Sequence, residues 1–128
     1  MALVFSIGGG AGYAASIAHS PTKITSHWLH LINNWTTDGT STGHPSYAVS
    51  GGVVYVSGGM HQTTGSKREF AFLPKAARPT HTLWIGVFSE AAMGGAFLEV
   101  TPAGAMFISG PDAQFFSSLS GVSFPVGS

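Results

Sequence analysis

Short apolar runs, separated by glycine, proline and small polar residues, follow one another along most of this chain. In several runs apolar and polar positions alternate with a period of two, which is typical of β-strands. The strongest local signal lies at residues 47–56, where two β-prone runs flank Gly51 and Gly52. A two-residue glycine link of this kind predicts a β-hairpin.

Further strands are predicted downstream of this hairpin. Phe70 and Phe72 lie two residues apart, so we expect them on one face of a strand that ends at Pro74. Residues 82–88 are apolar at both odd and even positions, which predicts a strand covered on both faces. More strands are expected at residues 97–101, 105–108, 114–116 and 119–124. About eight short strands with regular turns predict an all-β, antiparallel β-sandwich of the jelly-roll kind.

Residues 23–35 carry two overlapping patterns. Trp28, Leu31, Ile32 and Trp35 have helical spacing, while alternate positions from Trp28 also fit a strand. We favour the strand because the rest of the chain is β-prone, and we expect Asn33-Asn34 to form a turn. Residues 36–46 are expected to be a polar loop.

The first 22 residues differ from the rest, because they are small, Gly- and Ala-rich and uncharged. We interpret residues 1–22 as an extended N-terminal arm and residues 23–128 as the β-sandwich domain. No basic residue precedes Lys23, so a signal peptide is not expected. No run approaches the roughly 20 apolar residues of a membrane helix. The arm residues expected to make attachment contacts are Leu3, Val4, Phe5, Ile7 and Tyr13.

The charge content is low for a protein of 128 residues. Charged residues make up 8% of the chain and the formal net charge is zero, whereas about 25% is usual in soluble domains. Zero net charge argues against nucleic acid and anionic membranes as partners. With 44% hydrophobic residues, we expect a sheet face buried against copies of the same chain. A monomer with a neutral Ser/Thr/Gly surface is the alternative. The candidates for the interface or the core are Trp28, Trp35, Phe70, Phe72, Trp84, Phe88, Phe97 and Phe107.

No pattern of reactive residues predicts catalysis. Cysteine is absent, and the six histidines lack the spacing of a metal site, although an oligomer axis could still group copies of one histidine. The glycines at residues 8–12 do not continue into a phosphate-binding motif. We therefore expect no enzyme activity, no catalytic or metal-binding residues and no cofactor. Aromatic residues that either pack or form a sugar-stacking platform are Trp28, Trp35, Tyr47, Tyr55 and Trp84.

Several motifs occur in an order that resembles a family of small β-domains in tailed-phage virion proteins. The opening Trp28-x-x-Leu31-x-Asn33-Asn34-Trp35 is similar to its W-x-x-L-x-N-G-W, with asparagine where glycine is usual. The other segments that carry the resemblance are residues 45–47, 51–58, 72–79, 100–104 and 117–124.

The resemblance implies a homotrimeric β-sandwich head and no catalytic residues. Heads of this family usually follow a long fibre shaft, whereas only a short arm is expected here. The expected function is therefore that of a bacteriophage virion structural protein, a trimeric capsid decoration protein on the particle surface. Its partners would be its own copies and the major capsid protein, the latter contacted by the arm. The alternative is the receptor-binding tip of a tail fibre or appendage, with host-surface glycan bound at loops 36–46 and 91–95.

Overall fold

The structure, a computed structural model, describes residues 24–90 and 95–127. The strands form two antiparallel sheets, which confirms the all-β class and agrees with the predicted β-sandwich. The N-terminal arm and most of the loop at residues 91–95 lie outside the described residues. No helix in the described part is long and apolar enough to cross a membrane.

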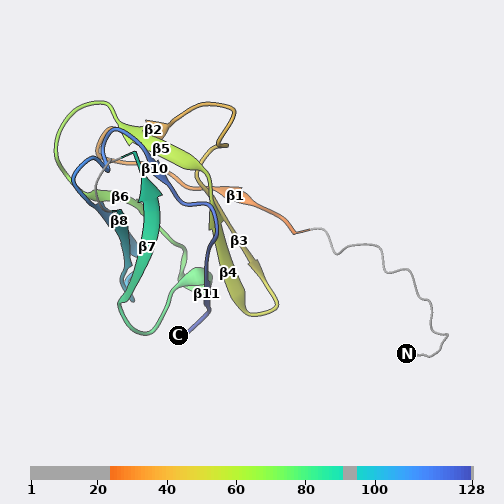
Figure 1. Ribbon diagram of the computed structural model, residues 1–128. Coiled ribbons are helices and arrows are strands. Elements are labelled where there is room, and N and C mark those ends of the chain that lie inside the picture. The colour runs from red at the N-terminus through yellow and green to blue at the C-terminus, as the bar shows by residue number, and fades with distance from the viewer. Residues whose placement is uncertain (1–23, 91–94, 128) are drawn as a thin grey trace.

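The smaller sheet has the strand order β1-β3-β4-β11, and the larger one has the order β2-β5-β10-β7-β8-β9-β6. In Figure 1 the β3–β4 hairpin stands on one side and β7 on the other. The elements are β1 (His27–Trp28), β2 (Trp35–Thr37), β3 (Ser46–Ser50), β4 (Val53–Ser57), β5 (Gly59–Gln62), β6 (Glu69–Phe72), η1 (Lys75–Ala77), β7 (Leu83–Ser89), β8 (Ala96–Val100), β9 (Ala105–Ser109), β10 (Ser117–Ser118) and β11 (Val122–Pro125).

The predicted hairpin is confirmed as β3 and β4. Ser50 pairs with Val53 across the turn, and both linking glycines have positive φ, 59° for Gly51 and 79° for Gly52. Two successive residues with positive φ are what a type I′ turn requires, and glycine adopts this conformation without a steric penalty.

The chain passes from the smaller to the larger sheet at Gly58, between β4 and β5. Its φ of 105° is outside the usual range for other residues, and a Cβ there would lie 2.6 Å from the Cα of Pro45. No strand was predicted at residues 59–62, so β5 was missed. Gly58 is the single residue between β4 and β5, so the glycine marks a change of sheet and not the end of the β structure.

Residues 24–35 contain no helix, so the preference for a strand is confirmed in part, but they do not form one continuous strand. Only His27–Trp28 pairs with β3, and the following residues cross to the larger sheet, where β2 begins at Trp35 and continues into the expected polar loop. The predicted turn is confirmed, since Asn33 and Asn34 have φ of 57° and 66°. Asn33 Nδ2 donates to the Glu69 carbonyl at 2.8 Å, which holds the crossing segment against β6.

The prediction that Phe70 and Phe72 share a face was also wrong. The pairing of β6 with β9 shifts register between Glu69 and Ala71. Phe70 and Ala71 therefore both point into the core with 0% exposure, and Phe72 points outward with 50%. A bulge inserts one extra residue and so reverses the alternation beyond it.

The hydrophobic core lies between the two sheets. Val54 and Val56 contribute from the smaller sheet, and Leu98, Met106 and Ile108 from the larger one. Trp35 packs in the same core and donates from Nε1 to the Lys67 carbonyl at 3.0 Å. The strand expected at residues 114–116 is a turn, and the pairing segment is β10, immediately after it.

Candidate functional site

The outward face of the larger sheet carries a group of exposed aromatic side chains. On β7, Trp84 and Phe88 alternate with the partly buried Leu83, Ile85 and Val87. The predicted strand is confirmed as β7, but in the single chain only its inward face is covered, and the predicted cover of the outward face stays a prediction. The inward residues pack on the core, and the outward ones are uncovered in the single chain.

The register of the strands places the other aromatics on the same face. Residues directly opposite one another share a face of a sheet. Gly86 of β7 is opposite Phe97 of β8, and Glu99 lies between Trp84 and Phe107 in one cross-strand row. We call this surface the aromatic face. Its exposed members are Phe72 at 50%, Trp84 at 62%, Phe88 at 66% and Phe97 at 56%, and Phe107 is half-buried beside them.

The aromatic face continues toward β10. Phe88 is opposite Ser118, and its ring meets Phe116 edge to face with 6.1 Å between centroids. A Cβ at Gly59 would clash with the Phe116 ring at 2.8 Å. The absence of a side chain at Gly59 therefore leaves room for the Phe116 ring. Through its contact with Phe88, Phe116 extends the aromatic face toward β5 and β10.

A second exposed aromatic lies on the smaller sheet. Trp28 is 74% exposed, and its ring stacks on His44 with 4.1 Å between centroids and 9° between planes. His44 Nδ1 donates to the Pro45 carbonyl at 2.9 Å, which fixes the orientation of the imidazole. The stack leaves one face of the indole open to solvent.

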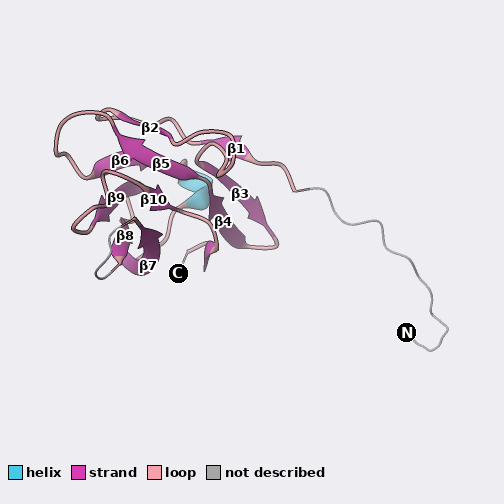
Figure 2. Ribbon diagram, turned by 45° about the horizontal axis from the view of Figure 1, so that its top comes forward, coloured by secondary structure: helices cyan, strands magenta, loops and turns pink. Residues whose placement is uncertain are grey.

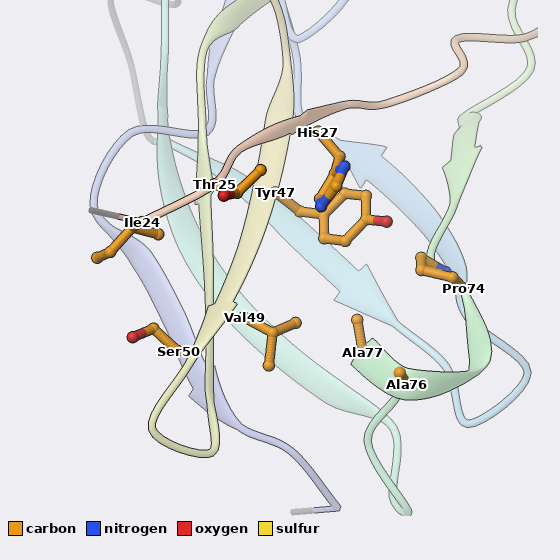
Figure 3. A pocket seen from close by; sticks show the side chains of 9 residues that line it. All are labelled: Ile24, Thr25, His27, Tyr47, Val49, Ser50, Pro74, Ala76 and Ala77. Atoms are coloured by element: carbon orange, nitrogen blue, oxygen red, sulfur yellow. The ribbon is translucent and has the colours of Figure 1, made fainter. Parts of the chain in front are cut away.

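A pocket of about 440 Å³ opens between the smaller sheet and η1. One wall is formed by His27, Tyr47 and Val49 of β1 and β3, and the other by Pro74 and by Ala76 and Ala77 of η1. Figure 2 shows η1 beside the β3–β4 hairpin, and Figure 3 shows the lining side chains. We call this cavity the side pocket.

No group of three or more potential metal ligands occurs among residues 24–90 and 95–127. His61 Nδ1 and Asp38 Oδ1 are 3.0 Å apart, and both side chains are about one-third exposed. An exposed pair of this kind orients an imidazole, but general acid–base catalysis also needs a positioned substrate group.

The structure divides the sequence-predicted interface and core residues into three groups. Trp35 and Phe70 are in the core, and Trp28 lies on the smaller sheet. The remaining five are together on the aromatic face: Phe72, Trp84, Phe88, Phe97 and Phe107. The attachment residues Leu3, Val4, Phe5, Ile7 and Tyr13 lie outside the described residues.

Sequence reasoning missed the side pocket. Tyr47 was among the candidate sugar-stacking aromatics, but His27 and the alanines of η1 were not associated with it. No sequence signal could have done so, because these residues meet only where the two layers come together at their edge.

Comparisons with known proteins find a likeness in fold alone. No family model matches the chain, and no curated protein matches it either. Among solved structures, the receptor binding protein (gp15) of Listeria phage PSA is similar, with a TM-score of 0.65. The alignment covers 83% of this chain and 67% of that chain at 16% sequence identity. At this identity the likeness is one of fold, and the two chains share the β-sandwich architecture.

Proposed function

We propose that this chain is a non-enzymatic structural protein of a tailed-bacteriophage particle, displayed on the virion surface as a homotrimer. The observation that carries the proposal is the aromatic face. Four large aromatic side chains on one sheet face are each at least half exposed, and a monomeric soluble protein rarely leaves a cluster of this kind uncovered. Aromatic residues are enriched in protein interfaces, where they bury large area.

Within the particle, we infer a place at the tip of a tail appendage, where the protein contacts the host surface. The solved neighbour is named as a receptor binding protein of a Listeria phage. This name favours the tail appendage over the capsid, and the order of motifs in the sequence supports a virion β-domain in either place.

Capsid decoration is the second candidate, and the observation that favours it is the uncharged, apolar segment at residues 1–22. In this case three arms of a trimer would contact the major capsid protein. Individually weak contacts add up through effective concentration when they are linked in one trimer.

Imaging intact particles that carry a label on this chain tests the location. Label at the tail tip is expected, and label over the head would favour decoration. A chain lacking residues 2–22 tests whether the arm attaches the protein to the particle. If the arm is the attachment element, the truncated protein still associates with itself but no longer binds particles. If label on the full-length chain is found neither at the tail nor over the head, the proposed function is contradicted.

A further inference from the structure

The side pocket has the features of a binding site for a small ligand. Its volume of about 440 Å³ falls within the roughly 300–1,000 Å³ of typical ligand pockets. It is formed by main elements of the fold, because β1, β3 and η1 all contribute to its walls.

Two rings dominate one wall of the side pocket. His27 and Tyr47 pack against each other with 5.3 Å between centroids and 31° between planes. Figure 3 shows the Tyr47 hydroxyl directed toward Pro74 and Val49 directed toward Ala77. A ligand with flat apolar patches would therefore contact an aromatic surface on one side and small aliphatic groups on the other.

The polar groups of the pocket are available for hydrogen bonds. Thr25, Tyr47 and Ser50 line the cavity and each carries a hydroxyl, of which Figure 3 shows that of Ser50 directed away from Tyr47 and η1. Neither these hydroxyls nor the ring nitrogens of His27 have a hydrogen-bond partner among residues 24–90 and 95–127. Hydroxyl groups both donate and accept, so they suit a ligand that also carries several hydroxyls.

The absence of charged side chains among the described residues that line the pocket favours an uncharged ligand over an anionic one. None of the residues that line it is acidic, lysine or arginine. The nearby Arg78 is engaged elsewhere, since its Nε donates to the Leu73 carbonyl at 2.9 Å. A phosphate or carboxylate would lose its hydration here without gaining a cation, which is unfavourable.

We propose that the side pocket binds one or two rings of an uncharged saccharide, with the rings of His27 and Tyr47 as its apolar platform. This inference rests on the proposed function in its receptor-binding form and moves the recognition site away from the loops at residues 36–46 and 91–95. Because the pocket belongs to the smaller sheet and η1, assembly through the aromatic face of β7 and β8 leaves it open.

An NMR titration of the full chain tests the proposal. The probes are the neutral disaccharides maltose, lactose and N,N′-diacetylchitobiose, with sialyllactose as the charged comparison. We expect at least one neutral sugar to shift amide resonances of β1, β3 and η1 more than sialyllactose does. The Tyr47→Phe variant, which keeps the ring, should weaken this binding about fivefold through loss of one hydrogen bond.

A blocking variant and a matched control complete the test. Ala76 is exposed and lines the pocket, so Ala76→Trp should fill the cavity and abolish the shifts without disturbing the core. Ala103 is exposed in the turn after β8, and Ala103→Trp should leave binding unchanged. Absence of shifts with every neutral sugar, or shifts that survive Ala76→Trp, would overturn the proposal.

Two further outcomes separate this proposal from others. If deletion of residues 2–22 shifts the pocket resonances without sugar, and sugar binds only afterwards, the arm is the occupant and the saccharide proposal is wrong. The mass of each sample in solution is measured in parallel. A trimer that binds no sugar contradicts only the proposal that the side pocket binds a saccharide. A monomer that binds sugar contradicts only the proposed trimer.

Discussion

The two faces of the larger sheet both carry large apolar side chains, but only those on the inward face are buried within the single chain. On the inward face, Leu98, Met106 and Ile108 are completely or almost completely buried and hold the two layers together. On the outward face, Trp84 and Phe97 are more than half exposed in the single chain. Burial of the first group stabilises the subunit, and the second group gains the same hydrophobic free energy only in an assembly.

The largest effect on stability is expected from Phe70, and Phe72 provides the matched comparison two residues away. Phe70→Ala should lower the free energy of unfolding by about 3–5 kcal/mol, because it opens a cavity in the core. Phe72→Ala should cost less than about 1 kcal/mol, since the side chain is half exposed. Urea unfolding of both variants, made in a background that does not associate, measures the difference. Equal losses would mean that the bulge in β6 does not separate the two faces.

The second effect concerns assembly through the aromatic face. Combining Trp84→Ser with Phe97→Ser should dissociate the proposed trimer, because aromatic anchors buried in an interface are often worth about 2 kcal/mol or more each. Tyr55→Ser is the control, since Tyr55 is an exposed aromatic on the outer side of the smaller sheet. Sedimentation velocity should show a smaller particle for the double variant only. Dissociation by Tyr55→Ser would move the interface to the other sheet.

These comparisons also show how far the sequence predicts the fold. The β3–β4 hairpin and the doubly apolar β7 were predictable, because Gly51-Gly52 and the apolar run at residues 82–88 are local signals. The bulge in β6 and the change of sheet at Gly58 were not, because they depend on strands far away in the sequence. One extra residue in β6 moves Phe72 to the opposite face.

The aromatic face and the side pocket also differ in how far local sequence signals predict them. The list of interface or core aromatics contained most of the aromatic face, but residue type alone could not separate Trp84 from Trp35. Burial of Trp35 depends on the crossing segment, which the Asn33-Asn34 turn directs toward β6. The side pocket depends on the approach of η1 to β3, which no motif encodes.

A smaller effect on stability is expected at the Asn33-Asn34 turn, which precedes the buried Trp35. Asn34 has φ of 66°, and its Nδ2 donates to Thr64 Oγ1 at 2.9 Å. Asn34→Ala should cost about 1–2 kcal/mol, because alanine is disfavoured in the left-handed region. Asn34→Gly should keep stability within about 0.5 kcal/mol of the wild type, since glycine adopts this conformation freely. Thermal unfolding of the pair measures the contrast, and equal losses would show that the Thr64 contact dominates.

The smallest effect is expected at the exposed His61–Asp38 pair on the edge of the larger sheet. Asp38→Asn should lower the free energy of unfolding by less than about 1 kcal/mol, because a partly exposed pair gains little over its contacts with water. Any part of the difference that comes from a charge on His61 should shrink further in concentrated salt. Chemical unfolding at low and high ionic strength tests this. A loss as large as that of Phe70→Ala would give the pair a structural role that its exposure does not suggest.

The most direct test of the account is the mass of the unmodified chain in solution, measured by sedimentation equilibrium over a dilution series. Burial of the aromatic face between copies predicts a stable species of about three times the 13.2 kDa of one chain. A soluble species that remains at 13.2 kDa throughout the series, without aggregation, would contradict it.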